Sequence, residues 1–230
     1  FVNFVLGAMG ADYYPRLAGV SHDKEAMNKL VNEQTEIGLL LAVPVLMATL
    51  CLAPWILQLF YSSEFLPAVD LLQWFVLGCL GRIIQWPMGF IQLALGKGDW
   101  FVFTQNLFNG MHLLLIWLGL LLFSLEGVSI AFFLLYVFSL GIILLVSRFL
   151  TGFRWSAPNW RFILIILPVV GVVFIASRML PLLPATIFGI AATAAASVIC
   201  LRGLLNRVGA DHHLMRVACR IPGMRTVCGL

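Results

Sequence analysis

The sequence predicts an all-α integral membrane protein, a polytopic transmembrane helical bundle with six complete spans and the end of a seventh. Of its 230 residues, 62% are hydrophobic and only 10% are charged, and the mean hydropathy is +1.02. A soluble domain carries about 25% charged residues, so this chain has too few polar side chains to cover a globule in water. Its charges also separate apolar intervals that are long enough to cross a bilayer.

These apolar intervals define the spans, because a transmembrane helix needs about 20 mainly apolar residues. The interval after residue 161 is short, but the flanking Arg161 and Arg178 can extend their long side chains to the membrane surface. The predicted spans are residues 37–60, 71–95, 100–125, 127–147, 162–177 and 179–201.

Residues 1–11 are expected to form the last part of the seventh helix. The chain starts at Phe1 and lacks the basic segment, short apolar core and cleavage site of a signal peptide. We therefore expect it to open inside a longer protein, and we expect a preceding half of that protein to share in the function.

Connections rich in Lys and Arg alternate with connections that are poor in them. Under the positive-inside rule the richer connections are cytoplasmic, and so is the C-terminus. We expect a membrane bundle over residues 1–205 and a basic cytoplasmic tail over residues 206–230. The net charge of +4 then reflects topology and contact with anionic membrane lipids, and the arginines are too scattered for nucleic acid to be a partner. The basic connections contain Arg16, Lys24 and Lys29, then Lys97, then Arg148, Arg154 and Arg161, and finally the arginines from Arg202 to Arg225.

Two segments are expected outside the membrane. Residues 21–36 predict a polar helix with Ser21 as its N-cap and acidic residues in its first turn. Residues 212–225 are basic and partly apolar, and are expected to lie on the membrane surface. The His212–His213 pair has no second group of ligands nearby, and the cysteines lack zinc or CxxC spacing, so neither a metal nor another cofactor is expected.

Arg82 is the most informative residue, because it lies near the middle of a predicted span. An Arg at mid-bilayer on a lipid-facing surface costs about 2.5–3.5 kcal/mol on insertion scales, so Arg82 is expected to face water or a partner. Polar and small residues recur around it at spacings of four and three, which places them on one face of a helix. This stripe consists of Gly78, Arg82, Gln85, Gly89, Gln92 and Gly96.

The next span repeats the pattern with Gln105, Asn109 and His112. Two polar stripes on consecutive helices indicate either a hydrophilic cavity between them or hydrogen bonds that join the helices. The prolines inside the spans are compatible with helices that bend around a cavity during alternating access, and equally with plain structural kinks. The candidate substrate-binding residues are Arg82, Gln85, Gln92, Gln105, Asn109 and His112, and the prolines are Pro44, Pro54, Pro87 and Pro168.

Several short motifs, in their order and spacing, resemble the oligosaccharide flippases known as O-antigen translocases. These belong to the multidrug/oligosaccharidyl-lipid/polysaccharide exporter superfamily, and the resemblance covers roughly residues 8–160. The motifs are DYYPRL at 12–17, which closes the first helix, NEQTE at 32–36, LLLAVP at 39–44, YSSEF at 61–65 and WPMGF at 86–90.

The resemblance implies a fold of two six-helix bundles, of which this chain is the C-terminal bundle, in the bacterial inner membrane. It implies a substrate, an undecaprenyl-diphosphate-linked oligosaccharide turned from the cytoplasmic to the periplasmic leaflet, and polysaccharide assembly proteins as partners. A cationic cavity for the diphosphate is a property of the family, and Arg82 fits that role. Some relatives couple transport to an ion through a membrane carboxylate, but no Asp or Glu lies well inside a complete span here.

Two other functions remain open. A multidrug or cation antiporter of the same superfamily would need a membrane carboxylate, which this half lacks, and a cavity that favours cations, which Arg82 works against. A membrane glycan polymerase, ligase or glycosyltransferase would need catalytic groups in a sizeable extramembrane loop, whereas the predicted loops are short and carry no nucleophile–base pair or phosphate-binding glycine loop. We therefore expect a transporter with no catalytic residues rather than an enzyme.

Overall fold

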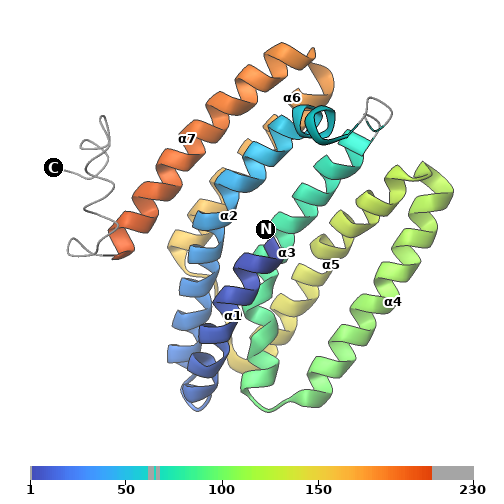
Figure 1. Ribbon diagram of the computed structural model, residues 1–230. Helices are drawn as coiled ribbons and strands as arrows, with labels where there is room; N and C mark the ends of the chain where they lie inside the picture. The colour runs from blue at the N-terminus through green and yellow to red at the C-terminus, as the bar shows by residue number, and fades with distance from the viewer. Residues whose placement is uncertain (1, 62–64, 66–67, 209–230) are drawn as a thin grey trace.

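The computed structural model describes residues 2–61, 65 and 68–208, and over this part of the chain it is an all-helical bundle (Figure 1). Six of the helices, α2 to α7, are long and apolar enough to cross a membrane, which confirms the predicted fold class. The predicted surface segment at residues 212–225 lies outside the described residues. The helices are α1 (Val2–Gly19), α2 (Lys24–Phe60), α3 (Ala68–Ala94), α4 (Gly98–Phe123), α5 (Glu126–Thr151), α6 (Ala157–Met179) and α7 (Leu182–Val208).

The first two helices differ from the sequence-based expectation. The first helix is expected over residues 1–11, but α1 continues through the DYYPRL motif and Pro15 to Gly19. The polar helix expected at 21–36 is continuous with the first span, since no proline lies at the border between them, and α2 is a single helix of 37 residues. At 1.5 Å per residue it is about 55 Å long, which exceeds the hydrocarbon core of about 30 Å.

The N-cap of α2 is Asp23, not Ser21 as predicted. One carboxylate oxygen of Asp23 accepts hydrogen bonds from the backbone N–H groups of Glu25 (2.9 Å) and Ala26 (3.1 Å). Both residues are favourable N-caps, so composition alone did not separate them. Ser21 instead belongs to the preceding turn, where its N–H donates to the Ala18 carbonyl oxygen.

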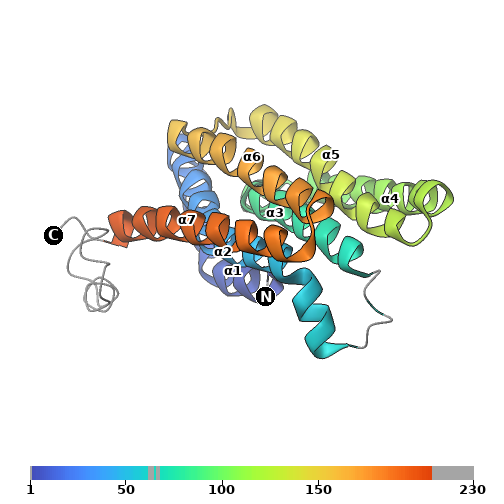
Figure 2. The same cartoon turned by 90° about the horizontal axis from the view of Figure 1, so that it is seen from above.

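Helices α2 and α3 form the centre of the bundle. Helix α3 packs against α1, α2 and α5, whereas α2 packs against α6 and α7. Helices α7 and α4 lie at opposite sides of the molecule (Figures 1 and 2). Helix α4 is held mainly by α5. The chain reverses direction at two levels, which we call the basic end (connections at 20–23, 95–97 and 152–156) and the opposite end (connections at 61–67, 124–125 and 180–181).

A buried amide network fixes the basic end. Asn159 is fully buried at the start of α6, and its Nδ2 donates to the carbonyl oxygen (2.9 Å) and the side-chain oxygen (3.0 Å) of Asn32 on α2. The same Asn32 oxygen accepts from the Ser156 N–H at 2.8 Å. Asn32 Nδ2 donates to the Arg154 carbonyl oxygen at 3.0 Å. These bonds satisfy backbone groups of the α5–α6 connection and join it to α2.

An ion cluster joins three helices at the opposite end. The Arg178 guanidinium on α6 lies 2.6 Å from the Glu126 carboxylate on α5 and 3.1 Å from the Asp70 carboxylate on α3. The Trp74 indole N–H also donates to Glu126, at 2.9 Å. The guanidinium is within 5.5 Å of the Trp74 ring centroid and 5.0 Å of that of Phe174. The pairs are partly exposed, so we regard the cluster as an orienting contact more than a large source of stability.

Pro54 leaves a carbonyl in α2 without its usual helical partner, because proline has no N–H to donate to Leu50 four residues earlier. The buried Gln73 of α3 approaches this carbonyl, with its Nε2 3.4 Å from the Leu50 oxygen. The same nitrogen donates to the Ser177 hydroxyl of α6 at 3.1 Å. The last turns of α2 bend away from the bundle beyond this point (Figure 2). A side chain from a neighbouring helix therefore partly compensates the break in α2.

Helices α4 and α5 meet at two glycines near the opposite end. A Cβ on Gly127 would lie 1.9 Å from the Gly119 carbonyl oxygen, and a Cβ on Gly119 would lie 2.4 Å from the Gly127 oxygen. The two backbones thus touch directly, as is common where small residues line membrane helix contacts. The absence of side chains at both positions allows α4 and α5 to pack this closely.

Replacing Gly127 by Ala should therefore force the α4–α5 hairpin apart. We expect a loss of about 1–3 kcal/mol, the usual cost of overpacking, seen as a lower midpoint of thermal unfolding in fluorescence-detected gel filtration of the detergent-solubilised protein. Gly110→Ala on α4 is the matched control, because its Cβ would meet nothing within 4 Å. An equal midpoint for the two variants would contradict the close packing.

Candidate functional site: a polar cavity between α3, α4 and α5

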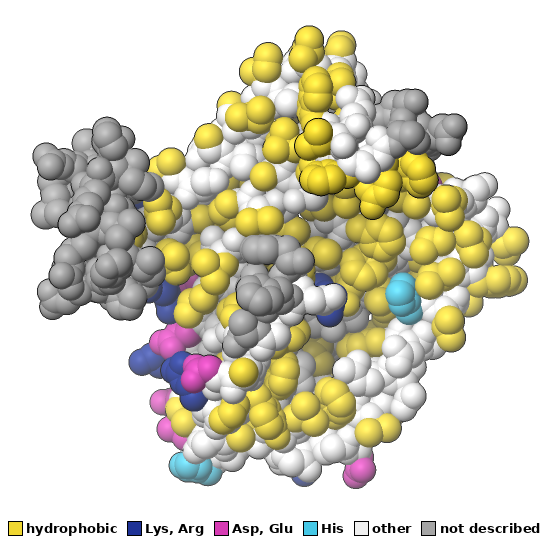
Figure 3. All heavy atoms as spheres, in the orientation of Figure 1, with side chains coloured by type: hydrophobic (Ala, Val, Ile, Leu, Met, Phe, Trp, Pro, Cys, Tyr) yellow, Lys and Arg dark blue, Asp and Glu magenta, His cyan; other side chains and the backbone are white. Residues whose placement is uncertain are grey.

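A cavity of about 430 Å³ lies between α3, α4 and α5. Figure 3 shows a hollow in this face of the molecule, with a basic side chain inside it and a histidine at its edge. The wall combines polar and aromatic side chains. The polar residues are Arg82, Gln85, Gln105, Asn109, His112 and Ser139, and the aromatic residues are Trp86, Phe90, Phe101, Phe108, Phe132 and Tyr136.

Arg82 supplies the permanent charge of this wall. It lies near the middle of α3 and is half-buried. Over the described residues it forms no ion pair, and the cavity lining contains no Asp or Glu. The cavity therefore presents one cation without a neutralising carboxylate, which favours an anionic ligand.

Two small residues of α3, Gly78 of the stripe and the nearby Gly81, explain how α5 comes to form part of the wall. A Cβ on Gly78 would lie 2.4 Å from the Phe132 ring, and one on Gly81 would lie 3.0 Å from the Tyr136 Cβ. The two helices thus approach closely, and both aromatic rings lie beside Arg82 in the lining. Gly89 has the reverse effect, because a Cβ at that position would meet no atom within 4 Å and the cavity stays open there.

Gln85 is fixed by a hydrogen bond within the wall. The Ser139 hydroxyl of α5 donates to Gln85 Oε1, so the Gln85 amide nitrogen is oriented and has donor capacity to spare. The α4 residues differ in this respect. Gln105 and Asn109 are exposed, and their side chains make no hydrogen bond within the part of the chain that the structure describes. Of the two alternatives for them, cavity lining and helix-to-helix bonding, the geometry fits the first.

Gln92 lies outside the lining, unlike the other five candidate residues. Its side chain is 1% exposed, and its Oε1 accepts a hydrogen bond from the Thr104 hydroxyl of α4 at 3.1 Å. It therefore joins α3 to α4 between the cavity and the basic end. Gly96, the last member of the predicted stripe, lies beyond the end of α3 with a φ of +66°, and it turns the chain into α4.

The α5 residues and the aromatic residues were not among the candidates from sequence. A signal for α5 does exist, since Phe132, Leu135, Tyr136 and Ser139 follow the same three-and-four spacing as the two polar stripes. It was missed because three of these residues are apolar or aromatic and look like an ordinary buried face. His112 lines the cavity from α4, and its ring centroid is 6.3 Å from that of Phe132 on α5.

The groups that line the cavity can pair with an anion and can donate and accept hydrogen bonds. One guanidinium, three amides, two hydroxyls and an imidazole surround the cavity, together with aromatic faces that stack on flat or ring-shaped apolar surfaces. No group of His, Cys, Asp and Glu that could hold a metal ion occurs within residues 2–61, 65 and 68–208. Comparison of the chain with protein-family models, with curated proteins and with solved structures gives no match.

If the cavity holds water, cysteines placed along it should react with a water-soluble maleimide. In a variant with its five native cysteines replaced, we expect Asn109→Cys to be labelled at least about tenfold faster than Leu114→Cys. Leu114 lies five residues further along α4 on the opposite face, and is 53% exposed toward the surrounding medium. In a bilayer that medium is lipid, where a thiol is protonated and unreactive. Equal labelling rates in proteoliposomes would show that the cavity is not a separate aqueous space.

Proposed function

We propose that the protein is a flippase that moves an undecaprenyl-diphosphate-linked oligosaccharide across the bacterial inner membrane by alternating access. The observation that carries the proposal is the half-buried Arg82, which lies without a carboxylate partner among the described residues in a polar cavity of a membrane-spanning bundle. A lipid-linked diphosphate is an anion that must pass this depth, and a cation held by the protein offsets its loss of hydration.

The remaining lining suits the glycan. The amides of Gln85, Gln105 and Asn109 can donate to and accept from sugar hydroxyls, and aromatic rings pack on the apolar faces of sugar rings. Because these contacts are numerous and individually weak, a transported glycan can be released as readily as it is bound. The volume of about 430 Å³ is within the range of about 300–1,000 Å³ for ligand sites.

The motif resemblance noted above supports the same function and makes this chain one bundle of a two-bundle protein. The hollow at the cavity is seen on the face of the molecule drawn in Figure 3. A second bundle on that face would close it and leave a passage between the halves. Polysaccharide assembly proteins are then the expected partners.

The two rival functions receive no support from the cavity. An antiporter for cationic drugs would place carboxylates in its binding site, and the lining contains none. A glycan polymerase or ligase would need a nucleophile or a general base with an orienting partner. The described connections are short, and at the opposite end Asp70 in the first turn of α3 and Glu126 in the first turn of α5 are both engaged with Arg178.

The proposed direction of transport requires the basic end to face the cytoplasm. Single cysteines at Lys97 and Ser124, in the two connections of α4, test this in spheroplasts of a cysteine-free variant. We expect a membrane-impermeant maleimide to label Ser124→Cys directly and Lys97→Cys only after the membrane is permeabilised. The reverse pattern would contradict the positive-inside assignment.

The role of Arg82 is tested by Arg82→Ala in the protein as its native host makes it. Loss of a charged hydrogen-bonding group costs about 1.5–3 kcal/mol, so we expect surface O-antigen to fall about ten- to a hundredfold at unchanged protein level. Lipid-linked oligosaccharide should accumulate behind the block. Arg82→Lys keeps the charge and should retain part of the activity.

Arg161→Ala provides the matched control, because Arg161 is exposed and does not line the cavity. We expect it to leave the lipopolysaccharide ladder on gels unchanged. Normal surface O-antigen in the Arg82→Ala strain would refute the role given to Arg82. Loss of O-antigen without accumulation of the lipid-linked precursor would refute the flippase step itself.

A further inference from the structure

A second hollow lies on the other side of α5 from the polar cavity. It is an apolar groove of about 510 Å³ lined by residues of α3, α5 and α6, with no charged side chain in its wall. Leu77 and Ile84 of α3, Val137 of α5 and Leu167 of α6 are typical of its lining. This groove takes no part in the proposed transport site.

At the basic end the groove meets a pocket of different character. This pocket, of about 490 Å³, is lined by Arg148 at the end of α5, by Arg154 in the α5–α6 connection, and by Trp155 and Trp160. The two tryptophans line the groove as well. The groove and the pocket therefore adjoin at these tryptophans, and together they present an apolar length, an aromatic junction and a cationic mouth.

Hydrogen bonds and a buried neighbouring side chain hold the backbone of the cationic mouth in place. The Arg154 backbone is held by Asn32 Nδ2 at 3.0 Å and by the Asn28 side-chain oxygen at 3.4 Å, and the neighbouring Phe153 is fully buried. Gly152 turns the chain at a φ of +74°, and its N–H donates to the Arg148 carbonyl oxygen at 2.8 Å. Neither arginine forms an ion pair with any residue that the structure describes.

The length of the groove matches one leaflet of a membrane. Its lining on α6 runs from Trp160 to Gly171, a rise of about 16 Å at 1.5 Å per residue. Half of a hydrocarbon core is about 15 Å. Tryptophan is enriched at the boundary between headgroups and hydrocarbon, and this is the position of Trp155 and Trp160 between the arginines and the groove.

We propose that this site binds one anionic membrane phospholipid, with its phosphate between Arg148 and Arg154 and an acyl chain along the groove. Basic pockets between membrane helices on the cytoplasmic side are a recognised setting for anionic headgroups. The assignment depends on charge complementarity and on the matching depth, not on the flippase activity, so either proposal can fail without the other.

Native mass spectrometry of the full chain tests the headgroup contact. The protein is released from micelles that contain equal amounts of dioleoyl phosphatidylglycerol and dioleoyl phosphatidylcholine, which share their acyl chains. We expect retention of one phosphatidylglycerol in preference to phosphatidylcholine. Arg148→Gln and Arg154→Gln should each weaken that retention about fivefold, the factor for about 1 kcal/mol per basic residue.

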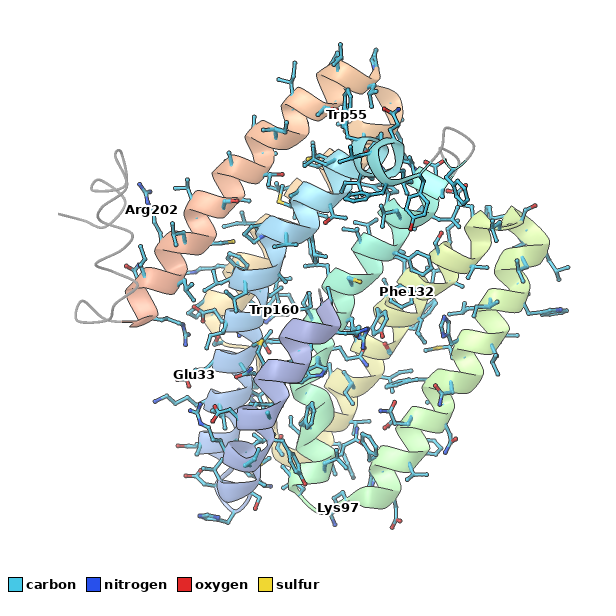
Figure 4. All side chains as sticks on the ribbon, viewed as in Figure 1. Glu33, Trp55, Lys97, Phe132, Trp160 and Arg202 are labelled. Carbon is cyan, nitrogen blue, oxygen red and sulfur yellow. The ribbon has the colours of Figure 1, made fainter. Side chains whose placement is uncertain are left out.

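Arg202→Gln is the matched charge control. Arg202 is exposed on α7 at the outer edge of the molecule (Figure 4) and lines neither the groove nor the pocket. We expect it to retain phosphatidylglycerol as the unaltered chain does. An equal loss in all three variants would mean that only net charge is sensed, and would overturn the site.

The groove is tested by Gly171→Leu, which adds a side chain where no atom lies within 4 Å of the new Cβ and so should not disturb folding. We expect it to lower retention severalfold, whereas Gly141→Leu on α5, equally open and outside the lining, should not. Equal retention of the two lipids, or an unaffected Gly171→Leu, would overturn the proposal. Displacement of phosphatidylglycerol by equimolar undecaprenyl phosphate would overturn it too, by assigning the groove to a carrier lipid.

Discussion

A guanidinium at the middle of a membrane helix is the constraint on which the rest of this architecture depends. The cost of placing Arg82 in hydrocarbon is too large for a marginally stable bundle to accept without compensation. The described residues offer it no carboxylate, and Arg82 lies instead among the polar side chains that line the cavity. Helices α3, α4 and α5 therefore enclose a polar space and not a packed apolar core.

The packing of α4 keeps that space open. Its backbone touches α5 at Gly119 and Gly127, and its start is joined to α3 through Thr104 and Gln92. Between these two attachments α4 carries polar residues toward α3 but makes little contact with it. By contrast, the Asn32–Asn159 contact joins α2 to α6 at the basic end, and the Arg178 cluster joins α3, α5 and α6 at the opposite end. The bundle thus has polar contacts between helices at both ends and a cavity on one side between them.

Much of this arrangement could be predicted from sequence, because it follows from periodicity. The spans and the stripe around Arg82 depend on spacings that a helix converts directly into faces. What periodicity does not give is the neighbour that each residue of a face meets. Gln92 shares the stripe of Arg82, but it lies where α3 and α4 converge and is therefore buried against Thr104. Similarly, Ser21 and Asp23 are equally good caps by residue type, and only the backbone path selected Asp23.

Helix α5 is the wall between two environments of opposite polarity. Tyr136 lines both the polar cavity and the apolar groove, and its Cβ lies against the position of Gly81 on α3. This contact leaves little room for α5 to move toward α3. A molecule in either space would touch the same aromatic side chain, so the separation of the cavity from the surrounding lipid depends on how tightly α3 and α5 are packed. The small residues Gly78 and Gly81 therefore matter to the site although neither can bind a ligand through a side chain of its own.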